Sequence, residues 1–177
     1  MTAVTLVTLR AERDKDLPFL QNLYAASRER EMALLMDWSD AQKREFLEQQ
    51  FTAQHSHYRQ HYPQARFDVI ERRGKPIGRL YVAELKRELR LIDIALMPVE
   101  RNKGLGKRFC REVMAEAERL GKIVSLHVED DNPAKKLYER MGFVVVGEVT
   151  FYKLMHWCPQ GLTHISTELL AQLKTAS

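Results

Sequence analysis

The segment RNKGLGKRF, residues 101–109, places two glycines one residue apart among four basic side chains. It follows an apolar run that ends at Pro98 and precedes a segment whose apolar residues recur at helical spacing. Glycines directly before a helix let the backbone approach a ligand, and the first helical N–H groups remain free to donate. The helix dipole adds positive potential there. The pattern therefore predicts a site for an anionic group such as a diphosphate.

Spacing excludes two nucleotide-binding patterns at this turn. A dinucleotide fingerprint needs a third glycine where Phe109 stands. A phosphate loop of the nucleoside-triphosphatase type needs glycine at the position of Arg101 and Ser or Thr at that of Arg108. A purely structural strand-to-helix turn with solvated basic residues stays open on this segment alone.

A second segment, NPAKKLYERMGF, residues 132–143, predicts a short helix with Asn132 as its cap, Pro133 in the first turn and Gly142 as its stop. Together with LIDIALMPVERNKGLGKRF, it resembles the GNAT superfamily of acyl-CoA-dependent N-acyltransferases. The resemblance rests on the turn from Arg101 to Gly106 and on the Asn, Tyr, Gly and Phe signature at Asn132, Tyr138, Gly142 and Phe143.

The resemblance implies a GNAT-like α/β fold: a mixed, mostly antiparallel central sheet of about seven strands, flanked by helices, with splayed fourth and fifth strands. It also implies acetyl-CoA as the acyl donor, bound in a core at 90–143. The implied cofactor contacts are the backbone of one strand, the glycine turn and the cap of the short helix: Ile94, Ala95 and Leu96; Asn102, Lys103, Gly104, Leu105, Gly106 and Lys107; and Asn132.

Attack on a thioester needs a neutral amine, but an alkyl amine is only about 0.1% neutral near pH 7.4. Relatives often carry a carboxylate on the fourth strand, and this chain has none on the face of Arg90 and Ile92. Asp93 alternates to the opposite face, so we expect a structural role for it. On the fifth strand, His127 shares a face with Glu129, and some relatives carry their base where His127 lies. A catalytic base and an ordinary strand histidine both stay open for His127.

Tyr138 corresponds to the tyrosine with which the family protonates the departing thiolate. The alternative is a core residue that continues the apolar stripe of Ala134, Leu137 and Met141. The N–H of Leu96 is expected to donate to the developing oxyanion.

Acceptor contacts are the least specified part of the site. In this fold the loop between the first two helices borders the acceptor, which suggests Met36, Asp37 and Trp38, with Glu129 as a further weak candidate. His57 and His61 are four residues apart but have no acidic third ligand nearby, so we expect no metal site.

The remaining pattern supplies the elements that must position these residues. Strand 4–10 precedes helices at 14–31 and 39–63, the second capped by Ser39 and preceded by a loop at 32–38. Three strands joined by turns, one of them RGKPIG, lead to a helix at 104–121 that stops at Gly121. KIVSLHVE is predicted to form the next strand, and two final strands follow it. Ile165, Leu169, Leu170 and Leu173 predict a C-terminal helix over 163–174.

The length and the hydrophobic content predict one domain over residues 1–177, and the resemblance implies that it is an N-acetyltransferase domain. The net charge is +4 with both signs mixed through the chain, which suits a small anionic ligand better than nucleic acid. Cys110 and Cys158 fit no disulfide framework, and no long apolar run occurs, so we expect a cytoplasmic protein with no membrane partner.

The predicted function is acetyl transfer from acetyl-CoA to a primary amine by direct attack in a ternary complex. The acceptor is a small-molecule or peptide amine, and the exposed last strand or the terminal helix could support a homodimer. The alternative is a non-catalytic acyl-CoA-binding sensor or interaction module that has lost its base.

Overall fold

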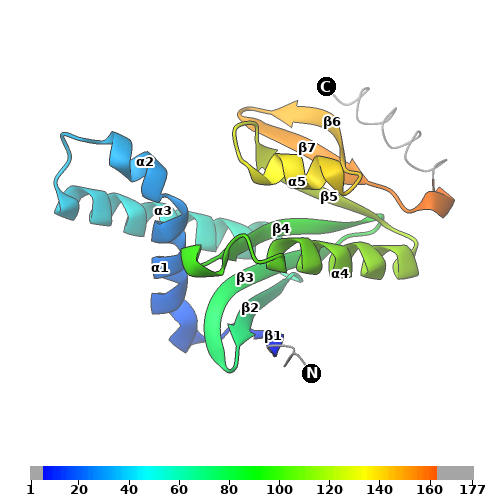
Figure 1. The fold of residues 1–177 in the computed structure, drawn as a ribbon, viewed down its shortest axis with the longest axis horizontal. Coiled ribbons are helices and arrows are strands. Elements are labelled where there is room, and N and C mark those ends of the chain that lie inside the picture. Colours follow the sequence, from blue (N-terminus) through cyan, green and yellow to red (C-terminus); the bar gives the residue numbers. More distant parts are fainter. Residues whose placement is uncertain (1–5, 163–177) are drawn as a thin grey trace. The chain divides into compact units, whose positions relative to one another are not determined.

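A computed structural model describes residues 6–162, so the helix expected over 163–174 lies outside the described residues. The chain divides into two compact units, Met1–Tyr81 with Asp93–Gly106, and Val82–Ile92 with Lys107–Ser177. The helices are α1 (Leu17–Ser27), α2 (Glu29–Leu34), α3 (Asp40–His61), α4 (Leu105–Leu120) and α5 (Ala134–Arg140). The strands are β1 (Val7–Ala11), β2 (Arg66–Arg72), β3 (Lys75–Glu84), β4 (Glu88–Leu96), β5 (Ile123–Glu129), β6 (Val144–Val149) and β7 (Tyr152–Trp157), labelled in Figure 1.

The seven strands form one sheet in the order β1-β2-β3-β4-β5-β7-β6. β1 with β2, β5 with β7, and β6 with β7 are antiparallel pairs. β4 and β5 are parallel, in register from Glu88↔Ile123 to Leu91↔Leu126, which is consistent with the predicted splay. The mixed, mostly antiparallel α/β sheet flanked by helices is thereby confirmed.

In the first unit, α3 begins where its cap predicts. The Ser39 hydroxyl accepts from the Gln42 amide at 3.2 Å, and the Gln42 side chain accepts from the Ser39 amide at 2.8 Å. Tyr24 of α1 meets Phe51 of α3 edge to face at 5.9 Å between ring centroids, and both are buried. This aromatic contact helps to hold the first and third helices together.

Two predicted boundaries in the first unit are wrong. The helix expected over 14–31 is interrupted at Arg28, and α2 then takes up part of the loop expected at 32–38. The turn expected over RGKPIG is only Arg73 and Gly74, whose φ values of 51° and 75° make a tight hairpin, so β3 begins at Lys75. A two-residue turn leaves the residues after it free to pair as strand.

In the second unit, α4 stops at Gly121, whose φ of 65° is the left-handed conformation expected for a helix end. Its buried face includes Phe109, Cys110, Val113 and Ala117, as the helical period predicts. β5 lies between β4 and β7, and α5 contacts β5. β4, β5 and α5 position the polar residues of the candidate site.

Candidate functional site

The glycine turn lies in the first unit and is anchored at its base. Arg101 Nε donates to the Leu96 carbonyl at 3.0 Å, which ties the turn to the end of β4. Asn102 and Gly104 have φ values of 59° and 80°. A Cβ added at Gly104 or Gly106 would meet no atom of the described residues within 4 Å. The turn therefore leaves open space above its backbone just where α4 begins.

The charges around this turn are only partly paired. Glu100 accepts from Arg72 at 2.8 Å and lies 3.5 Å from the Lys103 ammonium, which is about half exposed. Because the first-turn amides of α4 have no intrahelical acceptor, the exposed turn can bind an anionic group with backbone and side-chain donors.

The far half of β4 presents alternate backbone groups to its two edges. The Met97 amide donates to the Ile77 carbonyl of β3 at 2.9 Å, so alternation turns the amides of Ile94 and Leu96 away from β3. The Ala95 carbonyl lies against Gly78 of β3, where a Cβ would come within 2.4 Å of it. Ile94 and the amide of Leu96 thus offer backbone groups to a strand-like ligand. The Leu96 carbonyl already accepts from Arg101, and the backbone groups of Ala95 face β3, so the expected pairing of Ala95 with the cofactor is not supported.

Asp93 pairs with an arginine that sequence reasoning missed. Arg79 of β3 is buried and forms an ion pair with Asp93, and its guanidinium also donates to the Gln54 side chain at 2.8 Å. It lies 5.0 Å from the centre of the Tyr81 ring. A carboxylate that neutralises a buried cation supports the structural interpretation of Asp93.

In the second unit, Arg90 of β4 contacts three side chains. Nε donates to Ser125 Oγ at 2.6 Å, Nη1 to His127 Nδ1 at 3.0 Å, and Nη2 to Glu88 at 3.0 Å. The parallel register opposes Arg90 to Ser125, and His127 follows two residues later on the same face. The contact between Arg90 and His127 could have been suspected only from this register.

His127 is exposed, and it shares its strand face with the half-buried Glu129 as predicted. Partial desolvation of the ring, followed by the nearby positive charge of Arg90, lowers the pKa of His127 below its ordinary value of 6.5. The carboxylate of Glu88 opposes this shift. The imidazole is therefore neutral at physiological pH.

Tyr138 is buried in α5, and its ring lies 5.6 Å from that of Phe143 between centroids. The ring thus has a packing role in addition to any role of its hydroxyl. Asn132 is exposed, and its side-chain oxygen accepts from the Ala134 amide at 2.9 Å, whereas the N-cap position of α5 is Pro133, one residue later than expected. The amide nitrogen of the same side chain can still donate to a ligand.

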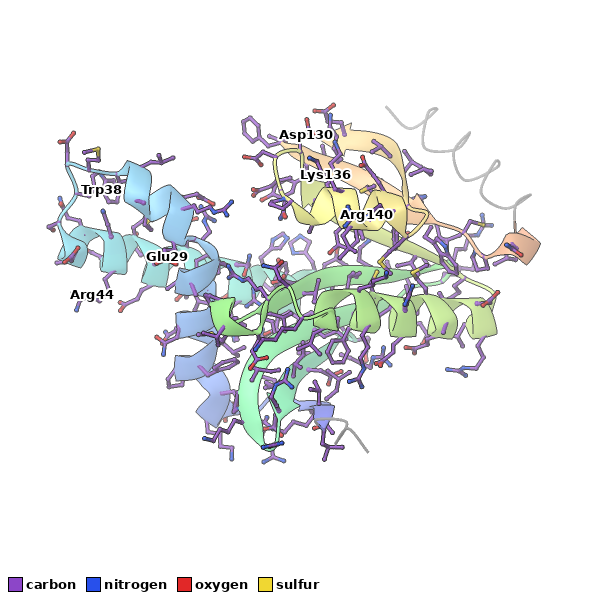
Figure 2. All side chains as sticks on the ribbon, viewed as in Figure 1. Glu29, Trp38, Arg44, Asp130, Lys136 and Arg140 are labelled. Atoms are coloured by element: carbon purple, nitrogen blue, oxygen red, sulfur yellow. The ribbon has the colours of Figure 1, made fainter. Side chains whose placement is uncertain are left out.

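The suggested acceptor loop joins α2 to α3 in the first unit, and Figure 2 shows Trp38 at this loop. Met36, with 87% of its surface accessible, and Asp37 are exposed. The Trp38 ring meets Phe46 edge to face at 5.6 Å between centroids. The loop has apolar, aromatic and acidic groups available to solvent.

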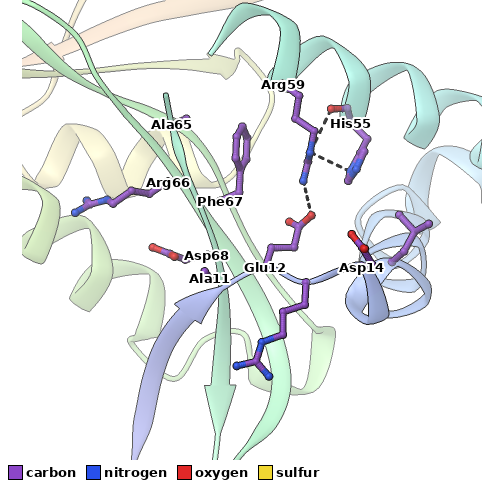
Figure 3. A pocket seen from close by; sticks show the side chains of 11 residues that line it. Ala11, Glu12, Asp14, His55, Arg59, Ala65, Arg66, Phe67 and Asp68 are labelled. Carbon is purple, nitrogen blue, oxygen red and sulfur yellow. Dashed lines mark hydrogen bonds and ion pairs between the residues drawn. The ribbon is translucent and has the colours of Figure 1, made fainter. Parts of the chain in front are cut away.

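A cavity of about 650 Å³ also lies in the first unit, and Figure 3 shows it between β1, β2 and α3. Glu12, one of its three acidic residues, accepts from Tyr81 at 2.5 Å and pairs with Arg59, which stacks on Phe67. None of the predicted site residues lines this cavity.

The histidines of α3 lie outside any metal-ligand cluster. Within residues 6–162, no group of three or more His, Cys, Asp or Glu side chains could hold a metal ion. His57 and His61 instead stack on each other with centroids 3.9 Å apart. No helix in the same range has both the length and the apolar character of a membrane span.

Comparison with known families decides the class of the protein. The model of the acetyltransferase (GNAT) family matches residues 24–143, which is most of the chain. The chain belongs to the GNAT family. No curated protein sequence matches the chain significantly.

Solved structures show the same GNAT fold at low identity. The PaiA N-acetyltransferase from Thermoplasma acidophilum, crystallised with coenzyme A, is 17% identical, with a TM-score of 0.67 over 87% of this chain and 99% of that one. The spermidine/spermine N-acetyltransferase SpeG from Vibrio cholerae, in mutant forms, is 23% identical, with a TM-score of 0.58 over 90% and 98%. A ribosomal-protein alanine N-acetyltransferase from Escherichia coli is 19% identical, with a TM-score of 0.55 over 85% and 91%.

Proposed function

We propose that this GNAT protein transfers the acetyl group of acetyl-CoA to a primary amine by direct attack in a ternary complex. The observation that carries the proposal is the open glycine turn at the start of α4, within the matched family region. Acetyl-CoA would supply an activated thioester carbonyl. The chain's own residues would bind it, accept a proton from the amine and return one to the thiolate.

The proposed cofactor contacts come from the glycine turn, the end of β4 and Asn132. The diphosphate would be held by Asn102, Lys103, Gly104, Leu105, Gly106 and Lys107. Backbone groups of Ile94 would pair with the pantetheine amides along a strand edge, and the Leu96 N–H would donate to the acyl oxygen. Asn132 would contact the cofactor arm through its side-chain amide N–H groups.

The proposed proton transfers use one residue as the base and another as the acid. As the amine nitrogen bonds to the acetyl carbon and the carbon–sulfur bond breaks, His127 would accept the amine proton, directly or through water. Tyr138 would donate its hydroxyl proton to the thiolate. With a phenol pKa near 10 and a thiol pKa near 8.5, this second transfer is uphill by about 2 kcal/mol, which a committed step can tolerate.

The proposed acceptor is a small-molecule or peptide amine. The SpeG and alanine acetyltransferase neighbours are named for amine acceptors of both kinds. Asp37 would attract a cationic amine, while Met36 and Trp38 would contact its apolar part, and Glu129 is a further candidate.

The free thiols of Cys110 and Cys158 suit a reducing cytoplasm, and the exposed Val144 and Val149 of β6 suit a homodimer contact.

Tyr138→Phe tests the acid. If the hydroxyl supplies the proton, turnover should fall about 10²-fold or more, while acetyl-CoA affinity measured by calorimetry stays within about twofold. Phenylalanine keeps the ring that packs on Phe143, so the fold should survive. Tyr62→Phe, at the C-terminal end of α3, is the matched control and should leave turnover unchanged.

The binding measurement also separates the alternatives. Absence of binding heat at tens of micromolar acetyl-CoA would contradict the proposal. Binding without release of free CoA across a panel of small amines, polyamines and peptide N-termini would favour the non-catalytic acyl-CoA sensor. Normal turnover in Tyr138→Phe would exclude Tyr138 as the acid.

A further inference from the structure

In the hydrogen bond between Arg90 and His127, Arg90 must be the donor. A guanidinium has donors and no acceptor, so the nitrogen it contacts must accept. Arg90 Nη1 lies 3.0 Å from His127 Nδ1, which must therefore carry a lone pair. In a neutral imidazole with an unprotonated Nδ1, the proton is on Nε2.

Two further hydrogen bonds hold the Arg90 guanidinium in place, so that it can select this tautomer of His127. Ser125, which is fully buried, accepts from Nε at 2.6 Å, and Glu88 accepts from Nη2 at 3.0 Å. The Arg90 side chain is itself only 14% exposed. Hydrogen bonds at Nε and Nη2 leave Nη1 directed at His127.

We infer that Arg90 is a positioning residue that holds His127 neutral with its proton on Nε2, so that proton uptake can occur only at Nδ1 and must break the bond to Arg90. The inference rests on the proposed function, because it concerns His127 as the proton acceptor. It adds a residue to that function which the family resemblance did not supply.

The consequence is a base whose proton affinity is set by its neighbours. Arg90 and Glu88 of β4 act on the imidazole, and Glu129 shares its face of β5. A positive charge on His127 also acts on the buried His156 of β7. Arg90 opposes a positive charge on His127, and Glu88 favours one. His156 sits opposite Ser125 in the β5–β7 register, and burial lowers its pKa as well, so it too is neutral near pH 7.

This arrangement favours the neutral imidazole, whose Nδ1 lone pair takes a proton once the contact with Arg90 breaks. A histidine at its ordinary pKa would be partly protonated at mildly acidic pH, whereas His127, whose pKa is lower, is protonated to a smaller extent at the same pH. The same repulsion expels the proton to water after the reaction. The basicity of His127 is reduced as a result. Removal of Arg90 should therefore increase the proton affinity of His127 and shift the pH range of activity toward alkaline conditions.

Nitrogen NMR of the full-length protein with labelled histidine tests the tautomer directly. The chain has six histidines, and His127→Ala assigns the signal. We expect protonated Nε2 and unprotonated Nδ1 in the unmodified protein, with titration below pH 6.5. Arg90→Gln should raise the titration midpoint and mix the tautomers, whereas Glu88→Gln should lower the midpoint further.

Activity gives the second measurement. The acidic limb of kcat/KM should move to higher pH in Arg90→Gln and to lower pH in Glu88→Gln, and a limb that moves by one pH unit reflects about a tenfold change in proton affinity. His127→Ala should abolish the limb, and adding Arg90→Gln to it should produce no further movement. Lys122→Gln, which removes a cation paired with Glu84 on the same sheet, is the matched control and should not move the limb.

The outcomes separate the inference from the proposed function. A protonated Nδ1 in the unmodified protein, or an unchanged His127 midpoint in both folded variants, overturns the role of Arg90. Midpoints that move without any movement of the acidic limb also overturn it, because Arg90 would then position a histidine outside the reaction. If no amine is acetylated, the proposed function fails, and the NMR result still decides the tautomer.

Discussion

Arg79 and Arg90 lie on neighbouring strands and use the same side chain for opposite purposes. Arg79 is almost completely buried and forms an ion pair with Asp93. Arg90 contacts a carboxylate, a hydroxyl and the imidazole of His127, whose pKa it lowers. A buried guanidinium needs a permanent counter-charge, whereas one beside an exposed histidine can tune a proton equilibrium. The partner therefore decides whether an arginine is structural or functional.

The largest expected effect comes from breaking the buried pair. Asp93→Ala leaves Arg79 without its counter-charge, so the free energy of unfolding should fall by about 3–5 kcal/mol, measured by urea denaturation. The double variant Arg79→Met with Asp93→Leu removes both charges and should recover most of the loss. A loss below about 1 kcal/mol in Asp93→Ala would show that the two arginines do not differ as described.

A smaller effect is expected from pH. Burial lowers the pKa values of His55, His127 and His156 below 6.5, so the unfolded chain takes up protons first as the pH falls. The free energy of unfolding should thus decrease from about pH 7 to pH 5, with a slope of at most about 1.4 kcal/mol per pH unit per histidine. Arg90→Gln should flatten this slope, because the pKa of His127 then approaches its unfolded value. Urea midpoints at each pH measure it, and an equally steep slope in that variant would contradict our account of Arg90.

The smallest effect is expected at an exposed pair. Arg108 donates to Glu112 at 2.9 Å on α4, and both side chains are nearly half exposed. Glu112→Gln should change the free energy of unfolding by no more than about 0.5 kcal/mol. A change comparable to that of Asp93→Ala would mean that the burial of an ion pair does not set its contribution to stability.

Local signals predicted several elements correctly. Ser39 caps α3, Gly121 ends α4, and the Asn132 side chain accepts from the first amide of α5, because each depends on hydrogen bonds or φ preferences within four residues. Local signals failed at Arg28, where the predicted helix is interrupted. They also failed at Lys75, where β3 begins earlier than the residues KPIG suggested. Periodicity alone does not reveal where a helix breaks or how short a turn can be.

The site shows the same division. The glycine turn and the short helix of Tyr138 could be predicted, because their residues are close together in the chain and match a family pattern. The partner of Asp93, which is 14 residues away, and that of His127, which is 37 residues away, could not. No local preference specifies which side chains two strands bring into contact.

The sequence by itself determined the family, the acyl-CoA signature and most of the elements, because helix periods, caps and turn residues act over a few positions. Only the tertiary structure decided the environment of each charged group. The β3–β4 contact buries Arg79 with Asp93, and the parallel β4–β5 register opposes Arg90 to Ser125 and brings it to His127. Strand register sets which charges meet and how much water remains around them, and these two quantities determine proton affinity.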